Sequence, residues 1–325
     1  MHQALLEFQP ADRRALQRVI DQQGLTIHTI LRHGPRFIVA VVEYQGKTAL
    51  WKMCVRTAKD DRWSMKKFFR EITFLSYFQD RSSPTATTFA PRLYACSTGV
   101  RPWYIRELIH GHDYALSGNI RFRESFFTEK NLRAILRGFH ELQSIPTSHL
   151  PKKLQRQLHR YDTVEQWFGF LAPFWEKVNE LLHDQHASQD LIAWLKDRKA
   201  VFDSLPTALA HHEPYAPHFL RYNNHLRLID WENINIASPV TDATILWMRA
   251  SRHPKWQASL HRRWKAHWKH LGKDFDTAWE TDLVVRSIYT MLSSKTYEDQ
   301  ADIRELVRVA KSVLKKTLST YRSKR

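Results

Sequence analysis

Runs rich in β-branched and aromatic residues dominate the first third of the chain and predict a small antiparallel sheet. Three runs form a meander, and two more follow after a helical stretch; the five runs are residues 25–33, 36–44, 48–55, 92–95 and 102–108. The stretch between the third and fourth runs, residues 61–77, places Phe68, Ile72 and Leu75 on one helical face. The pattern therefore predicts a five-stranded sheet with one helix inserted after the third strand.

A helical period replaces this pattern from residue 113 onward. Thr128 is a suitable N-cap for an amphipathic helix, and further helices are predicted by the same spacing; the predicted set covers residues 128–142, 164–183, 189–202, 241–251, 256–271, 276–293 and 299–321. A short helix over residues 10–23, ended by Gly24, precedes the sheet. The fold class is thus α+β, with a β-rich N-terminal part over residues 1–109 and a mostly helical part over residues 110–325.

A hairpin is predicted inside the helical part. Two short apolar runs, residues 218–222 and 226–229, are separated by the pair Asn223-Asn224, which favours a tight turn. Glu213 lies in the loop that leads into the hairpin, and Asp230 directly follows its second strand. Phosphoryl transfer needs one carboxylate near the attacking hydroxyl and another on the metal that bridges the phosphates. A surface hairpin with ordinary charged ends would give the same pattern.

Lys52 is a second candidate for chemistry because it interrupts an otherwise apolar strand between Trp51 and Met53. Burying an ammonium group without a partner costs several kcal/mol. Glu71, at the margin of the apolar face of the 61–77 helix, is the expected partner. A solvent-facing strand position for Lys52 and an exposed helix position for Glu71 are the simpler alternatives.

The formal net charge of +17 favours anionic partners: an anionic membrane face, phosphorylated substrates or, less favoured, nucleic acid. Solvated helix surface is the alternative explanation for much of this charge. The chain contains no apolar run of membrane-spanning length and no signal-peptide core, so a cytoplasmic protein is expected, with peripheral contact at the inner membrane face as an option. Cys54 and Cys96 are expected to be reduced core residues.

Taken in order, these features resemble the protein-kinase-like superfamily, and in particular the aminoglycoside phosphotransferase and choline kinase branch. The resemblance implies a two-lobe fold, ATP as phosphate donor and Mg²⁺ as metal. It implies that Lys52 contacts the nucleotide phosphates and pairs with Glu71. The segment 104–111 resembles the hinge that binds adenine, which implies nucleotide contacts at Glu107 and Ile109. Residues 229–232 resemble the metal-binding segment, with Asp230 on Mg²⁺, and Asp242 resembles the aspartate that supports the catalytic loop.

The catalytic loop departs from the family pattern. That pattern is His-Gly-Asp with an Asn five residues after the Asp, whereas this chain has His211-His212-Glu213 and His218. The segment 215–220, Tyr-Ala-Pro-His-Phe-Leu, is similar to the loop of lipopolysaccharide core heptose kinases. An alternative register puts Pro214 at the aspartate position and Phe219 at the asparagine position. The phosphate-covering loop, residues 32–36, carries the single glycine Gly34.

The resemblance therefore implies an ATP-dependent phosphotransferase that acts on a hydroxyl of a sugar, of a lipopolysaccharide core or glycolipid, or of another small molecule. It assigns catalysis to Glu213, His211 and His218, with His218 also assisting Asp230 at the metal. Replacement of the family aspartate by Glu213 moves the carboxylate by about one ångström, and such shifts can cost roughly 10²-fold in rate. A pseudokinase that serves as a basic module for membrane or RNA is the alternative. The sequence leaves the acceptor and the oligomeric state open.

Overall fold

The computed structural model describes residues 9–33, 36–55, 62–81, 89–116, 121–293 and 301–325. The chain forms two compact units, and each is described by itself. Unit 1 comprises Met1–His112, Leu150–Gln157 and Leu220–Ile234, and unit 2 comprises Asp113–His149, Leu158–Phe219 and Asn235–Arg325. Unit 1 thus takes two segments from the part of the chain that follows residue 110, and one of them contains most of the predicted hairpin.

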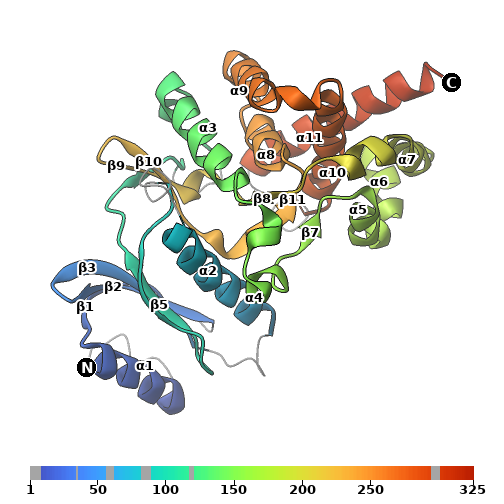
Figure 1. The fold of residues 1–325 in the computed structure, drawn as a ribbon. Coiled ribbons are helices and arrows are strands. Elements are labelled where there is room, and N and C mark those ends of the chain that lie inside the picture. Colours follow the sequence, from blue (N-terminus) through green and yellow to red (C-terminus); the bar gives the residue numbers. More distant parts are fainter. Residues whose placement is uncertain (1–8, 34–35, 56–61, 82–88, 117–120, 294–300) are drawn as a thin grey trace. The chain divides into compact units, whose positions relative to one another are not determined.

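Unit 1 contains the predicted five-stranded antiparallel sheet, in the order β1-β2-β3-β5-β4 (Figure 1). Its strands are β1 (Thr26–His33), β2 (Phe37–Tyr44), β3 (Lys47–Cys54), β4 (Leu93–Ser97) and β5 (Trp103–Glu107). Helix α1 (Pro10–Gln23) begins with proline in its first turn and ends at Gly24, whose φ of 60° is favourable for glycine. Helix α2 (Arg62–Arg81) extends four residues beyond the predicted end at residue 77.

The two helices cover opposite faces of this sheet (Figure 1). Leu16 and Val19 of α1 pack against Ala49, Trp51 and Met53, whereas residues of α2 pack against Leu50 and Cys54. Because side chains alternate along a strand, Lys52 lies on the same face as Leu50 and Cys54, which is the α2 face. The alternation of β3 therefore directs the lysine toward Glu71, as predicted.

The predicted hairpin is formed by β9 (Phe219–Tyr222) and β10 (His225–Leu228). Asn223 and Asn224 have φ values of 47° and 62°, the positive values that a two-residue type I′ turn requires. After β10 the chain enters a short 3₁₀ helix, η7 (Trp231–Asn233). The Trp231 ring stacks on Phe74 of α2 with 4.8 Å between the ring centroids, and this contact fixes the end of the hairpin against α2.

Unit 2 is mostly helical. Its helices are α3 (Glu129–Gln143), α5 (Val164–Leu171), α6 (Trp175–Leu182), α7 (Ala187–Ser204), α8 (Thr241–Arg249), α9 (Pro254–His267), α10 (Asp274–Ser293) and α11 (Ala301–Arg322). Thr128 caps α3 as predicted, since its side chain accepts a hydrogen bond from the backbone N–H of Asn131. The predicted helix over 164–183 is instead divided into α5 and α6 by a 3₁₀ turn, η5 (Ala172–Phe174). Pro173 explains the division because proline has no N–H to continue the helical hydrogen bonds.

A three-stranded sheet in unit 2 was not predicted. It consists of β7 (Arg160–Tyr161), β11 (Asn235–Ala237) and β8 (Ala208–Ala210), in that order. These strands are two or three residues long, which is too short for an alternating pattern to be recognised. The chain also forms a two-residue strand, β6 (His112–Asp113), and a four-residue helix, α4 (Lys152–Gln155).

Two further observations bear on the sequence predictions. Cys54 is buried as expected, but Cys96 is exposed, because it lies on β4 at the edge of the sheet. In the described part of the chain, none of the helices combines the length and the apolar character that crossing a bilayer demands.

Candidate active site

Lys52 and Glu71 form a buried ion pair in unit 1. The Lys52 Nζ atom lies 3.1 Å from Glu71 Oε2, and the two side chains are 12% and 2% exposed. The same ammonium group lies 3.3 Å from Glu232 Oε2. The predicted pairing is therefore present, and Glu232 is an additional partner that the sequence reasoning did not assign.

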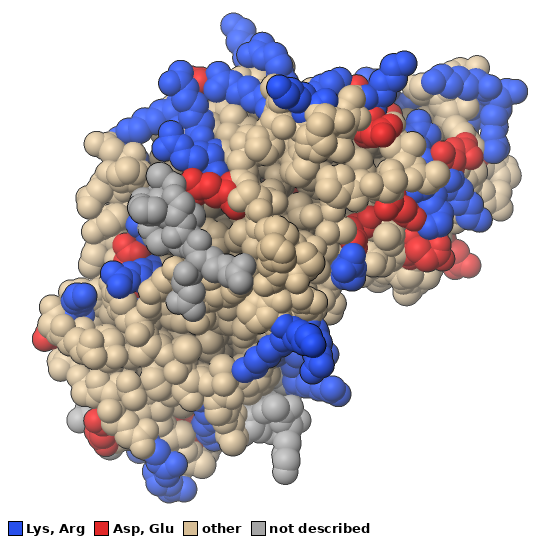
Figure 2. All heavy atoms as spheres, viewed as in Figure 1, with Lys and Arg blue, Asp and Glu red and all other residues tan. Residues whose placement is uncertain are grey.

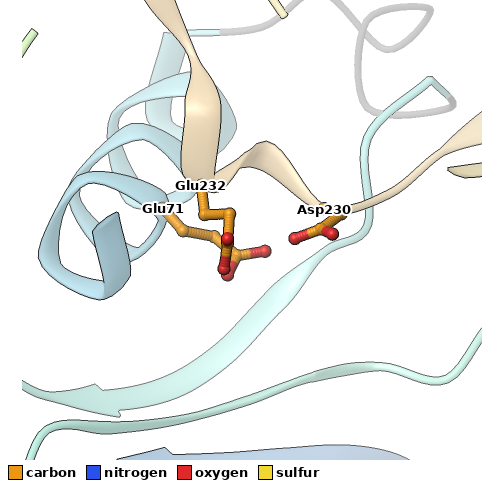
Figure 3. A group of neighbouring side chains, drawn as sticks. All are labelled: Glu71, Asp230 and Glu232. Carbon is orange, nitrogen blue, oxygen red and sulfur yellow. The ribbon is translucent and has the colours of Figure 1, made fainter. Parts of the chain in front are cut away.

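Glu71, Asp230 and Glu232 form a cluster of three carboxylates, one from α2 and two from the segment after β10 (Figure 3). One oxygen atom of each carboxylate lies within 4.8 Å of the others. Asp230 adopts a left-handed conformation, with φ of 66° and ψ of 61°. Such backbone conformations are uncommon outside glycine, and aspartate is among the residues that tolerate them best.

Electrostatics explain why Lys52 stays charged in this cluster. Burial lowers the pKa of Lys52, but the carboxylates of Glu71, Asp230 and Glu232 outweigh burial and hold that pKa well above its usual value. Burial raises the pKa of Glu71, and Asp230 and Glu232 add to this rise, against the effect of Lys52. Three carboxylates at this separation repel one another, so the cluster favours a bound cation. Carboxylate oxygens are ligands that suit Mg²⁺, and the donor set fits that ion.

Lys67 is a further cation at this cluster. Its Nζ atom lies 3.3 Å from Glu232 Oε1 and 4.1 Å from the centroid of the Trp63 ring. Glu232 therefore bridges two lysines, one on β3 and one on α2. In the sequence, Lys67 was noticeable only as one member of the basic run 66–70. An ordinary solvated helix surface explains such a run equally well.

The hinge residues are held by contacts within unit 1. The carboxylate of Glu107 accepts hydrogen bonds from Arg227 and from the backbone N–H of Arg92. Ile109 is buried, and its carbonyl accepts a hydrogen bond from the backbone N–H of Gly111. A Cβ atom at Gly111 would lie 2.6 Å from the carbonyl oxygen of Arg221, so the hairpin passes too close for any other residue. The predicted nucleotide contacts of Glu107 and Ile109 remain predictions.

In unit 2, β8 leads directly into the predicted catalytic loop. The backbone N–H groups of His211 and His212 donate to the two carboxylate oxygens of Asp242, over 2.8 and 2.9 Å. His212 has a φ of 72°, in the left-handed region that favours glycine. The family pattern has glycine at this position, so the backbone favours the register in which Glu213 replaces the family aspartate. The alternative register with Pro214 has no such support.

Two histidines hold the backbone around Glu213. The backbone N–H of Glu213 donates to Nδ1 of His211 over 3.3 Å, and His211 is fully buried. Nδ1 of His218 lies 2.7 Å from the carbonyl oxygen of Glu213. Because a carbonyl only accepts, Nδ1 of His218 carries the proton, and the lone pair of the neutral ring is on Nε2, where a metal could bind. His211 thus hydrogen-bonds to the backbone of the loop, whereas the Nε2 atom of His218 is suited to bind a metal.

Arg286 of α10 contacts the same loop, Asp282 of α10 contacts α8 and Arg286, and the sequence reasoning missed both. Arg286 Nη2 donates to Nε2 of His212 over 2.8 Å, so His212 carries its proton on Nδ1. Asp282, also buried, accepts hydrogen bonds from the hydroxyl groups of Thr241 and Thr244. These residues lie about 70 positions after the loop, within a helix whose residues 281–288 are all buried, and the sequence pattern that predicted this helix did not distinguish them.

The predicted site residues are thus brought together in two sets. Unit 1 contains the Lys52–Glu71 ion pair with the Asp230 carboxylate within 4.8 Å of that of Glu71, and unit 2 contains His211, Glu213 and His218. The combination of His218 with Asp230 on one metal involves both units and remains a prediction. Gly34 and Pro35, the centre of the predicted phosphate-covering loop, lie outside the described residues.

Several solved structures of aminoglycoside phosphotransferases share this fold. The chain resembles APH(4)-Ia with a TM-score of 0.63 at 11% sequence identity, over 93% of this chain and 97% of that one. It resembles the GDP complex of aminoglycoside 2′-phosphotransferase-IIIa with a TM-score of 0.58 at 14% identity, over 93% and 98% of the two chains. The gentamicin complex of APH(2″)-IIa gives a TM-score of 0.56 at 16% identity, over 93% and 95%.

These similarities confirm the predicted α+β, two-lobe protein-kinase-like fold. No curated protein matches the chain. Residues 33–278 match the model of the phosphotransferase enzyme family, which is more than half of the 325 residues. The chain belongs to the phosphotransferase enzyme family.

Proposed function

We propose that this protein is an ATP-dependent phosphotransferase that acts on a hydroxyl group of a small-molecule or glycolipid acceptor. The observation that supports this proposal most strongly is the position of the Asp230 and Glu232 carboxylates beside the Lys52–Glu71 ion pair. A phosphate-binding lysine and a metal-binding carboxylate are the two parts that phosphoryl transfer requires on the nucleotide side. Membership of the phosphotransferase family and the ADP and AMP-PNP complexes of APH(4)-Ia agree with ATP as donor.

In this proposal unit 1 holds the nucleotide. Lys52 contacts its phosphates, Glu71 keeps the lysine in position, and the backbone near Glu107 and Ile109 contacts the adenine. Asp230 and Glu232 hold Mg²⁺, with Nε2 of His218 as a further ligand. When bound, the metal neutralises charge that develops on the phosphate oxygens.

Unit 2 supplies the groups for the acceptor. The Glu213 carboxylate orients or deprotonates the attacking hydroxyl, as the aspartate does in related enzymes. His211 positions this residue through the backbone rather than through contact with the acceptor, since its side chain is fully buried. Asp242 and Arg286 hold the loop in place: Asp242 accepts hydrogen bonds from the backbone of His211 and His212, and Arg286 donates to the His212 ring.

The acceptor is proposed to be a sugar, with a lipopolysaccharide core or other glycolipid as a specific option. The similarity of residues 215–220 to the heptose kinases motivates that option. The basic face of α11 also supports a peripheral contact with an anionic membrane, since Arg304, Arg308, Lys311 and Lys315 recur at helical spacing and line one open hollow together with Lys316. In Figure 2, Lys and Arg side chains gather over α3, α9 and the end of α11.

The alternative is a pseudokinase that keeps the fold without the activity. The observation that favours the pseudokinase is the replacement of the family Asp and Asn by Glu213 and His218. One experiment separates the two functions: ADP release is followed with ATP and Mg²⁺ across a panel of neutral sugars, acidic sugars and aminoglycosides, in parallel with Asp230→Ala. Acceptor-dependent ADP release that Asp230→Ala abolishes would support the phosphotransferase. Release that is absent throughout, or is unchanged by the substitution, would reject it.

A further inference from the structure

A pocket in unit 2 lies outside the set of residues that the proposed function uses. Residues 121–127, the carboxyl end of α8 with the turn that follows it, and the first turns of α11 surround this pocket (Figure 1). The aromatic side chains of Phe122 and Phe127 belong to its lining. In the described part of the chain, the lining includes none of the residues proposed above to contact nucleotide, metal or acceptor.

The size of the pocket limits what can enter it. Its volume is about 40 Å³, and one water molecule needs about 10–15 Å³ of such a volume. The pocket therefore has room for roughly three oxygen atoms, which is enough for one phosphoryl or carboxylate group. A whole sugar ring or nucleobase is larger, so a ligand could place only one such group inside.

Positive charge exceeds negative charge in the lining. Among the described residues that surround the pocket, three are arginines, Arg121, Arg249 and Arg252, and Glu305 is the single acidic residue. The Glu305 carboxylate is already engaged, because Arg252 forms an ion pair with it and the Ser251 hydroxyl donates to it over 3.0 Å. Even with this pair counted as neutral, the lining keeps the charge of two guanidinium groups.

Arg121 and Arg249 are both placed to donate to an anion. Arg121 is half-buried, and in the described part of the chain its side chain forms no hydrogen bond or ion pair. The Arg249 guanidinium lies over the Tyr215 ring, 4.0 Å from its centroid, and stacking uses none of the five N–H donors. His253, which also lines the pocket, lies 3.5 Å from the exposed Glu124 carboxylate, which offsets any charge on the imidazole. A half-buried cation has lost part of its water, so a bound anion stabilises it more than an exposed cation.

Arg249 also joins the pocket to the catalytic loop. Its aromatic partner Tyr215 lies two residues after Glu213, and the Tyr215 backbone N–H donates to the Glu213 carbonyl oxygen over 2.7 Å. An anion bound to Arg249 would therefore contact a residue that itself touches this loop.

We propose that this pocket binds one oxyanion group, a phosphate monoester or a carboxylate, of a small-molecule ligand. Arg121 and Arg249 supply the positive charge, and the planar fork of donors on arginine matches the oxygen atoms of phosphate and carboxylate groups. Phe122 and Phe127 cover the carbon atoms next to the charged group. The proposal goes beyond the proposed function and concerns a second site, so it holds whether or not the protein transfers a phosphoryl group.

The test is isothermal titration calorimetry of the full chain with glucose 6-phosphate, glucuronate, inorganic phosphate and glucose, at constant ionic strength and without Mg²⁺. Binding is expected from an anionic probe and not from glucose, and the stronger of glucose 6-phosphate and glucuronate identifies the group as phosphate or carboxylate. Arg121→Gln should weaken that binding by about 10- to 100-fold, the range for a charged hydrogen bond. Arg262→Gln is the matched control, since Arg262 is an exposed arginine of α9 outside the pocket.

Glu305→Gln should give a result of the opposite sign. It removes the carboxylate that competes for Arg252, so it should strengthen binding of the anionic probe, which a variant that only damages the fold would not do. Melting temperatures establish that each variant is folded. The proposal is overturned if no anionic probe binds, if glucose binds as tightly as the anions, if Arg121→Gln and Arg262→Gln have equal effects, or if Glu305→Gln fails to strengthen binding.

Discussion

Nδ1 of His218 lies 2.7 Å from the carbonyl oxygen of Glu213, five residues earlier in the chain. An asparagine side chain can donate the same hydrogen bond through its amide and still present an oxygen to a metal. The histidine makes the hydrogen bond, and its Nε2 atom could bind the metal, so we expect it to be able to replace the asparagine that the family has at this position. This equivalence is the strongest reason to regard the loop as competent rather than degenerate.

We expect His218→Asn to retain phosphotransfer within about 10-fold of wild type, and His218→Ala to lose about 10²-fold. The alanine variant lacks both the hydrogen bond to Glu213 and the proposed metal ligand. Steady-state rates at several Mg²⁺ concentrations measure both effects. His225→Ala, at an exposed histidine of β10, is the control. Equal activity of the Asn and Ala variants would show that the side chain serves neither purpose.

Lys52→Met should destabilise the protein by roughly 3–5 kcal/mol at pH 8, because it leaves the buried Glu71 carboxylate without its cation. Added Mg²⁺ should recover part of this loss, since a divalent cation can neutralise the three carboxylates in place of the ammonium group. Urea unfolding with EDTA and with Mg²⁺ measures both effects. Lys47→Met, at an exposed lysine on the same strand, should show neither effect. A Lys52→Met variant that Mg²⁺ does not stabilise would argue against a metal at these carboxylates.

His212→Gly should be more stable than His212→Ala by about 1–2 kcal/mol, because both lose the imidazole contacts and only glycine adopts a φ of 72° without strain. The comparison isolates the backbone, since the contacts to Tyr161 and Arg286 disappear in both variants. Chemical denaturation of the two proteins gives the difference directly. Equal stabilities would mean that the loop relaxes out of the left-handed conformation when the imidazole is removed.

Stability should also depend on Asp242. Burial raises the pKa of Asp242 to about 7, against the opposing hydrogen bonds from His212 and His211. The folded state then binds more protons than the unfolded state between about pH 4 and pH 7, so the free energy of unfolding falls as pH rises through this window. Asp242→Asn does not titrate and serves as the reference. Relative to it, the free energy of unfolding of wild type should fall by about 2–3 kcal/mol between pH 5 and pH 8. A parallel pH dependence in both proteins would assign the effect to other groups.

Binding to anionic vesicles tests the basic face of α11. Each lysine near an anionic surface contributes about 1 kcal/mol, so Lys315→Glu/Lys316→Glu should weaken binding at low salt by about 30-fold or more. The matched control is Lys152→Glu/Lys153→Glu, which makes the same change in net charge at two exposed lysines of α4. Sedimentation with phosphatidylserine vesicles measures the partition. Equal losses of vesicle binding in the two double variants would indicate that net charge alone attracts the protein. They would reject a specific role of the α11 face.

The parts of the fold that depend on local pattern could be predicted from the sequence. The five-stranded sheet, the Asn223-Asn224 turn and the pairing of Lys52 with Glu71 follow from alternation, turn chemistry and the cost of a buried charge. Other parts depend on contacts between distant segments. Three-residue strands such as β8 carry no period, and the hydrogen bond from Arg286 to His212 joins residues 74 positions apart. Glu232 was visible beside Asp230, but only the position of α2 shows that Lys52 and Lys67 contact it.

Unit 1 is built from segments that lie far apart in the chain, and this has a consequence during synthesis. The sheet and α2 are complete once residue 112 has emerged from the ribosome, but Asp230 and Glu232 arrive with the segment that ends at Ile234. At translation rates of about 5–20 residues per second, roughly 6–24 s pass between the completion of the sheet and the synthesis of these two acidic residues. Until then Lys52 has Glu71 as its carboxylate partner, and the face of α2 that receives Trp231 is uncovered. A ribosome that stalls within this interval would therefore present an aromatic surface to chaperones.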